Sequence, residues 1–435
     1  MIEPLDTADE KLRAFMVACT QRGQGQELTA EMLDELEELT TTFGAVPAGR
    51  MTLRLAEPSP RYLVGSGSAE NVVQALHAKQ CNLLVFDDDL SPAQQRNWEK
   101  LAKVPVIDRH GLILEIFAQR ASTREAVLQI ELARAGYMLP RLKGGWTHLS
   151  RQRGGGAGAR GGEGEKQLEL DGRMVREQIA KLKAELEVVQ KRRAEQRKKR
   201  QSVPVPSASI VGYTNAGKSS LLNKVTQSSV FVEDKLFATL DPTTRRVELP
   251  NNQIMLLTDT VGFVRKLPHD LVEAFKATLE EAVQANFLVH VVDAANPSAE
   301  DHIATTHRVL DEIGVKDKEH LLVFNKIDLL TEPYQLARLR RRHPDAVFIS
   351  VHSGAGLDEL AERMAEIIAD GLNQVAYRLP HDRGDLVALL HRTSHIETET
   401  YEDDGTYIEA SVPPTTQRAL AEFAVPLIVD PEPVA

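Results

Sequence analysis

The stretch GYTNAGKS, residues 212–219, decides the fold of this protein. It follows the apolar run ASIV at 208–211 and leads into SLLNKV at 220–225, which is typical of a helix start. A G-x-x-x-x-G-K-S loop between a strand and a helix binds phosphates, because its glycines let backbone N–H groups close around the oxygens. A bare turn before a helix is the alternative, and the motifs downstream argue against it. The predicted phosphate-binding residues are Gly212, Tyr213, Thr214, Asn215, Ala216, Gly217, Lys218 and Ser219.

A second motif predicts which base is bound. The apolar run LLVF at 321–324 predicts a buried strand, and NKID follows at its end. Asp328 can accept two hydrogen bonds from guanine N1–H and the 2-amino group, which adenine lacks, so we expect guanine specificity. The SVH tripeptide after AVFI at 346–349 has the position of a further guanine-contacting loop. The predicted base-binding residues are Asn325, Lys326, Ile327, Asp328, Ser350, Val351 and His352.

Two segments between these motifs have the pattern of nucleotide-sensing switches. The strand pattern NQIMLLT at 252–258 leads into a D-x-x-G motif, and FATLDPTT lies upstream at 237–244. A threonine of the upstream segment is expected to complete a Mg²⁺ site with Ser219 and to lose that contact on hydrolysis. Spacing leaves Thr239, Thr243 and Thr244 open. The predicted switch residues are Phe237, Ala238, Thr239, Leu240, Asp241, Asp259, Thr260, Val261 and Gly262, and the candidate catalytic residues are Lys218 and Gly262.

Two positions bear on how such a site hydrolyses GTP. Phe263 follows the D-x-x-G motif, where Ras-like enzymes have a glutamine that orients the attacking water. Either another group orients this water, or turnover is slow until a partner completes the site. In some potassium-stimulated GTPases an asparagine at the position of Asn215 ligates K⁺. The alternative is that Asn215 bonds to the local backbone.

Composition places the chain among soluble proteins with several domains. It has 435 residues, 42% hydrophobic and 26% charged. The two cysteines have no metal-binding spacing and fit a reducing cytoplasm. The N-terminus does not resemble a signal peptide, and no apolar run is long enough to span a membrane.

The predicted fold class is α/β, with a P-loop GTPase domain at 204–371. An α/β domain at 1–121 and a long antiparallel helical hairpin at 122–203 precede it, and a small α+β domain at 372–435 follows. The first hairpin helix is predicted to end before Pro140. The second is predicted over about 165–201, with a seam at Val175, Ile179, Leu182, Leu186 and Val189. In the last domain, 386–401 and 406–412 are predicted to form a β-hairpin.

The hairpin tip at 140–162 is rich in glycine and arginine. Residues 141–201 hold 17 Lys and Arg against 8 Asp and Glu, a net charge of +9 in a chain of net charge −11. Arginine-rich segments order against phosphates and stacked bases, so RNA contact is predicted. A flexible solvated linker is the alternative. The predicted ribosomal-RNA contacts are Arg151, Arg153 and Arg160.

Long stretches of the chain resemble the HflX family of translational GTPases. Besides the nucleotide motifs, they are FDDDLSPAQQRN at 86–97, VIDR at 106–109, LILEIFAQRA at 112–121, GGEGE at 161–165 and FATLDPTTR at 237–245. The resemblance selects Thr239 as the metal-binding threonine. It implies a stress-related GTPase that binds the large ribosomal subunit and its RNA and splits stalled or idle ribosomes. A nucleotide-dependent RNA helicase or chaperone and a non-catalytic anti-association factor are the alternatives.

Overall fold

The computed structural model describes residues 11–21, 26–55, 57–142, 161–200, 205–226, 236–237, 239–250, 253–266, 281–315, 318–370, 373–402, 404–412 and 414–427. Its internal contacts divide the chain into two compact units. The first holds the described residues up to Lys191 together with Leu236, Phe237 and Lys266, and the second holds the remainder.

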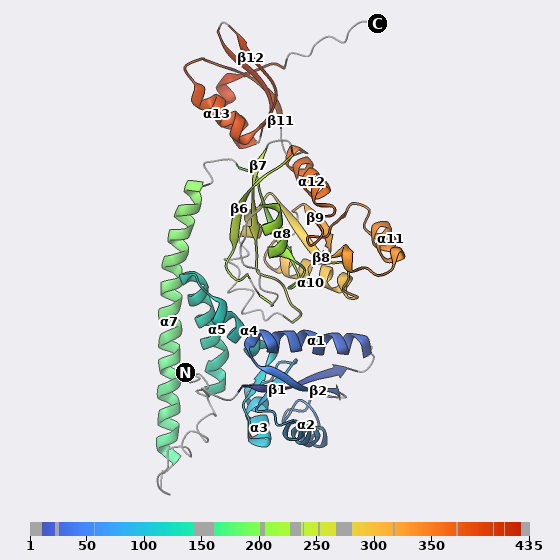
Figure 1. The fold of residues 1–435 in the computed structure, drawn as a ribbon. Helices are drawn as coiled ribbons and strands as arrows, with labels where there is room; N and C mark the ends of the chain where they lie inside the picture. Colours follow the sequence, from blue (N-terminus) through green and yellow to red (C-terminus); the bar gives the residue numbers. More distant parts are fainter. Residues whose placement is uncertain are drawn as a thin grey trace. The chain divides into compact units, whose positions relative to one another are not determined.

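The first unit contains a four-stranded parallel sheet with helices on both faces (Figure 1). Its strand order is β2-β1-β3-β4, and every residue of β3 is buried because both faces of the sheet are covered. Helices α2 and α3 pack with Phe15 and Val17 of β1. The elements are β1 (Arg13–Gln21), α1 (Gln26–Phe43), β2 (Val46–Leu55), α2 (Ser66–Ala78), β3 (Leu83–Phe86), α3 (Pro92–Ala102), β4 (Val106–Asp108) and α4 (Arg109–Arg120).

Two long helices, α5 (Arg124–Leu142) and α7 (Gly161–Arg200), form the predicted antiparallel hairpin. Arg124 at the start of α5 pairs with Glu185 late in α7, whereas Leu142 at its end shares a cleft with Val175. The predicted seam is the least exposed stripe of α7, and Leu182 is its buried member.

The prediction that α5 ends before Pro140 is wrong. Proline removes only one helical hydrogen bond, and in the last turn other contacts compensate. Arg141 stacks on Tyr137, with the guanidinium carbon 3.5 Å from the ring centroid, and it donates to Asp108 at 3.1 Å. These contacts hold the helix to Leu142.

The second unit contains a six-stranded sheet of order β10-β9-β8-β5-β7-β6, parallel except for the edge strand β6. Helices α8 and α12 pack on one face, whereas α10 and α11 pack on the other. The predicted P-loop GTPase domain is therefore present, as a sheet covered by helices on both faces. The elements are β5 (Ser207–Gly212), α8 (Lys218–Val225), β6 (Thr243–Glu248), β7 (Ile254–Asp259), β8 (Phe287–Asp293), α10 (Ala299–Glu312), β9 (His320–Asn325), η1 (Ile327–Leu329), α11 (Pro333–Arg342), β10 (Val347–Phe348) and α12 (Leu357–Asp370).

The last residues form a small antiparallel sheet of order β12-β13-β11-β14. The predicted β-hairpin is correct only from His395 onward, because the segment before it is the helix α13. Leu386, Val387 and Leu390 share one side of this helix and pack on the sheet. The elements are β11 (Asn373–Leu379), α13 (Gly384–Thr393), β12 (His395–Glu402), β13 (Gly405–Val412), α14 (Pro414–Ala419), η2 (Ala421–Phe423) and β14 (Ala424–Val425). Among all described helices, none combines the length and apolar character needed to cross a membrane.

Candidate nucleotide-binding site

The loop between β5 and α8 depends on two glycines with positive φ. Gly212 has φ 143°, and a Cβ there would lie 2.2 Å from the carbonyl oxygen of Val291. Gly217 has φ 95°, and a Cβ there would lie 2.3 Å from Asn325 Nδ2. Only glycine fits either position. The loop is also fixed by Tyr213, whose ring stacks on His302 with centroids 3.7 Å apart.

Lys218, the first residue of α8, places a buried ammonium group inside the loop. Its Nζ donates to the carbonyl oxygen of Tyr213 at 2.7 Å. Burial lowers the pKa of Lys218 to about 8, and the nearby Asp259 carboxylate opposes that shift. A buried cation at a helix N-terminus is stabilised by an anion, so the geometry favours phosphate.

Three oxygen-bearing side chains from separate segments meet beside Lys218. The Ser219 hydroxyl lies 2.7 Å from Thr239 Oγ1 and donates to Asp259 Oδ2 at 2.6 Å. Burial raises the pKa of Asp259, and its Oδ1 has no hydrogen-bond partner among the described residues. Two hydroxyls and a carboxylate with a free buried oxygen form a donor set that Mg²⁺ favours. The residues present therefore fit this ion.

The other candidate threonines lie on β6. Thr244 bonds to Thr258 of β7 through their hydroxyls at 2.9 Å, and Thr243 is paired with Asp259 in the β6–β7 register. Thr239 is thus the candidate that the structure brings to Ser219.

Gly262 brings the D-x-x-G segment against the phosphate loop. A Cβ at Gly262 would lie 2.7 Å from Thr214 Cγ2 and 2.8 Å from Lys218 Nζ. The next residue extends this contact, since Phe263 N donates to the Gly212 carbonyl and Phe263 O accepts from Thr214 N. The Phe263 side chain is fully buried. It therefore presents no polar group to a water at the phosphates.

The remaining switch residues divide between the two units. Thr260 donates to the Ile210 carbonyl at 2.7 Å, and Val261 and Leu240 are buried. Asp241 is half-buried. Phe237 belongs to the first unit, where it packs edge-on against Phe117 of α4. Ala238 lies outside the described residues.

Asn325 connects the phosphate loop to the SVH loop. Its Nδ2 donates to the Ala216 carbonyl at 2.9 Å, and its Oδ1 accepts from Val351 N at 3.1 Å. Ser350 is buried and its hydroxyl accepts from Ser353 N at 3.1 Å. The exposed His352 completes this loop.

The other residues of the NKID motif lie in the turn and the η1 helix that follow β9. Lys326 has φ 65° and pairs with Asp293 at 2.7 Å, and Ile327 N donates to the Ile349 carbonyl. Asp328 is exposed and makes no side-chain bond within the described ranges. Its carboxylate is available to a base.

Sequence reasoning missed Asp293 and the stacking partner His302. Asp293 is a polar residue at the end of the buried strand β8. The same pattern marks the other strands that carry site residues, so it could have identified Asp293. No sequence pattern indicated His302. The predicted RNA contacts Arg151, Arg153 and Arg160 lie outside the described residues.

Three family models match successive parts of the chain. They are described as GTP-binding GTPase N-terminal at residues 30–118, GTP-binding GTPase middle region at 120–200 and 50S ribosome-binding GTPase at 207–326. Among solved structures, a GTP-binding protein of the archaeon Sulfolobus solfataricus in complex with GDP is 24% identical. That match covers 82% of this chain and 98% of the other with a TM-score of 0.43.

Relatives match almost the whole chain. GTPase HflX of Akkermansia muciniphila is 46% identical over 90% of this chain and 92% of its own. GTPase HflX of Escherichia coli K12 is 44% identical over 88% and 89%. The nucleotide motifs by themselves occur in many GTPases, but these alignments cover nearly the whole chain. The chain therefore belongs to the HflX family of GTPases and hydrolyses GTP.

Proposed function

We propose that this GTPase binds the large ribosomal subunit in its GTP form and dissociates stalled or idle ribosomes during stress. The observation that carries the proposal is the meeting of Ser219, Thr239 and Asp259, because it joins the phosphate loop to both switch segments. A switch of this kind suits a factor that must bind and then leave a large partner. The match of residues 207–326 to a 50S ribosome-binding GTPase model supports the choice of partner.

The same three side chains would hold Mg²⁺, with Ser219 and Thr239 as ligands and Asp259 acting through water. The ion supplies positive charge to the oxygens of the β- and γ-phosphates. Lys218 would neutralise charge on these oxygens from the other side, since its ammonium is already desolvated. The Gly262 amide would donate a hydrogen bond to the γ-phosphate. Hydrolysis removes this phosphate, so the hydrogen bond would be lost and the segment that follows Gly262 would be released.

Base selection would come from Asp328. Its exposed carboxylate lies in η1, which follows β9 and the Asn325 bonds that hold the phosphate and SVH loops together. Guanine offers the two adjacent donors that a carboxylate can accept. Asp328→Asn should therefore weaken GTP binding about tenfold to hundredfold. Binding should move to xanthine nucleotides, whose 2-oxygen accepts from an amide.

Sucrose-gradient profiles of idle ribosomes test the whole proposal. We expect subunits to separate with GTP and the factor to stay on the large subunit with a non-hydrolysable analogue. Asp328→Asn should split ribosomes with XTP and fail with GTP, whereas Asp345→Asn, another exposed aspartate, should behave as wild type. Ribosomes that stay intact under every nucleotide would contradict the proposal.

The rival functions give different results in two further assays. A helicase would unwind an isolated RNA duplex while hydrolysing nucleotide, with no subunit present. An anti-association factor would keep subunits apart without any rise in GTP turnover. Splitting that requires GTP, with turnover raised by ribosomes and no unwinding of free RNA, leaves only the proposed function.

A further inference from the structure

A histidine is buried in the sheet of the second unit. His290 is in the middle of β8 between Val289 and Val291, which face the core shared with α8 and α12. Strand alternation turns His290 to the opposite face, which α10 covers. The side chain is 1% exposed. Neither of its ring nitrogens has a hydrogen-bond partner among the described residues.

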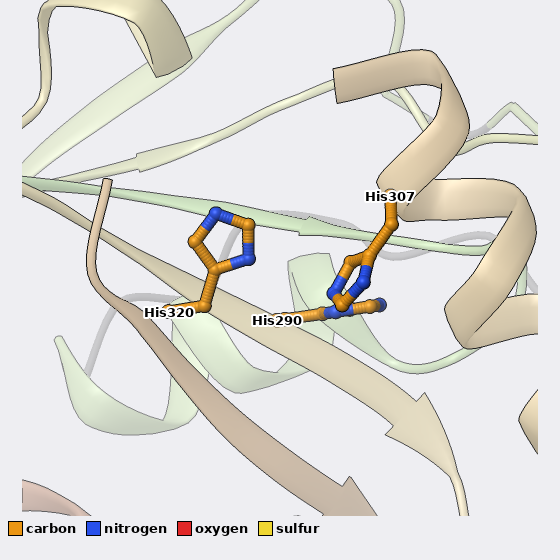
Figure 2. A group of neighbouring side chains, drawn as sticks. All are labelled: His290, His307 and His320. Carbon is orange, nitrogen blue, oxygen red and sulfur yellow. The ribbon is translucent and has the colours of Figure 1, made fainter. Parts of the chain in front are cut away.

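Such an imidazole needs an explanation. A neutral ring carries one N–H donor and one acceptor nitrogen, and buried polar groups are almost always satisfied by protein, water or an ion. Two further histidines gather beside it (Figure 2). They are His307 of α10, which is exposed, and His320 at the start of β9, whose Nε2 is also buried without a partner among the described residues.

The three rings lie close together. One ligand nitrogen from each lies within 4.8 Å of the others. The ring centroids of His290 and His320 each lie 5.3 Å from that of His307, with interplanar angles of 53° and 73°. Nitrogens bound to one tetrahedral Zn²⁺ ion are about 3.4 Å apart. Small rotations of the side chains would bring them there, and the exposed His307 is the easiest to move.

We propose that His290, His307 and His320 form a binding site for a divalent transition-metal ion, with Zn²⁺ as its best-fitting occupant. Imidazole nitrogen favours zinc and its neighbours over Mg²⁺ or Ca²⁺, which prefer oxygen. Three histidines leave a fourth position of a tetrahedron open, and the exposed side of His307 lets water fill it. The ion would connect β8, β9 and α10.

Protonation and charge around the cluster agree with this assignment. Burial, then the neighbouring His307 and His320 and also Lys218, lower the pKa of His290 to about 3. Burial and His307 lower that of His320 as well, while Asp311 of α10 opposes the shift. Neutral imidazole is the form that binds metals. The negative charge of Asp311 would attract the cation, whereas the positive charge of Lys218 would repel it.

Titration of the untagged full-length protein with Co²⁺ and Zn²⁺ tests the site. We expect one Co²⁺ per chain with the intense visible bands of tetrahedral coordination, displaced by one equivalent of Zn²⁺ in calorimetry. His307→Ala and His320→Ala should each weaken Zn²⁺ binding by tenfold or more. His77→Ala, an exposed histidine on α2, should leave it unchanged.

A second readout guards against a variant that fails to fold. His307 is exposed on a helix, so its alanine variant should keep the far-ultraviolet circular dichroism and the GDP affinity of the wild type. Zn²⁺ should raise the melting temperature of the wild type and not that of His307→Ala. No saturable binding, or binding of equal strength in the folded His307→Ala variant, would show that the histidines form only a packed ring cluster.

Discussion

At the scale of single residues, Gly262 leaves no room for a side chain between the D-x-x-G segment and the phosphate loop. A methyl group there would overlap with Thr214 and with Lys218 Nζ, and Phe263 ties the adjoining backbone to the phosphate loop. Relief of the overlap therefore requires the Gly262 backbone, Lys218 or Thr214 to move. The Gly262 amide and Lys218 are the proposed partners of the γ-phosphate.

Gly262→Ala should consequently lower GTP hydrolysis by about 10²-fold, the usual loss when one preorganised donor is misplaced. Folding should persist, because Gly262 lies outside the strands of the sheet. Gly136→Ala is the matched control, since a Cβ there meets nothing within 4 Å. Steady-state phosphate release measures both variants. An unchanged rate in Gly262→Ala would show that the D-x-x-G segment can shift without affecting catalysis. The Gly262 amide would then have no part in hydrolysis.

Asn215 raises the question of a monovalent ion. It has φ 60° in the phosphate loop, its side chain is exposed, and it makes no side-chain bond within the described part of the chain. Its amide oxygen is thus available as a ligand. This favours binding of K⁺ over the alternative that Asn215 bonds to the local backbone.

GTP hydrolysis should then be faster in KCl than in NaCl of equal ionic strength, and Asn215→Ala should remove the difference. Because the αL conformation suits asparagine better than alanine, Asn215→Gly serves as a second variant without backbone strain. Equal rates of the wild type in both salts would mean that no potassium ion takes part.

At the scale of elements, prediction succeeded where local chemistry decides the structure. The β5–α8 loop has to contain its two glycines, because a Cβ at either position would overlap with another backbone or side-chain atom. The sequence motif therefore follows directly from the geometry of the loop. The seam of α7 was predictable because its spacing follows the helix period. The prediction failed at α13, because the apolar residues of that segment fit the period of a helix as well as that of a strand. Only the sheet that they cover decides between the two.

Contacts between distant segments were the part of the site that could not be predicted. Asn325 was placed by its motif, but the pairing of Lys326 with Asp293 and the stacking of Tyr213 on His302 depend on how neighbouring strands align. The histidine cluster is of the same kind. Its three members have no ligand spacing in the sequence and meet only through the β8–β9 register and the packing of α10.

The hairpin gives a prediction for the element that carries the basic charge. Replacing Arg151, Arg153 and Arg160 with alanine should weaken large-subunit binding and lower its salt dependence, since each lost phosphate contact removes a slope of about 0.7. A control with equal charge loss replaces Arg173, Arg176 and Lys181, which are exposed on α7. GTP affinity should be normal in both. If the two triple variants bind alike, total charge matters and the tip does not.

At the scale of the whole molecule, the position that orients the attacking water in Ras-like enzymes holds a side chain that cannot do so. Lys218, the hydroxyl cluster and Gly262 would bind and polarise the phosphates, but the side chain that follows the D-x-x-G motif is the buried Phe263. We expect a factor with this arrangement to keep GTP until a group outside the nucleotide site orients the water. That property is useful to a protein whose release must wait for its partner.

Basal GTP hydrolysis should therefore be slow, and large ribosomal subunits should raise it by about 10³- to 10⁵-fold, the range that partner-supplied groups contribute in other GTPases. Small subunits serve as the control for nonspecific RNA. Single-turnover rates with preloaded GTP separate this effect from faster nucleotide exchange, which would raise only the steady-state rate. Rapid single-turnover hydrolysis by the isolated protein would mean that the chain orients the water itself, and release would then be timed by binding alone rather than by the ribosome.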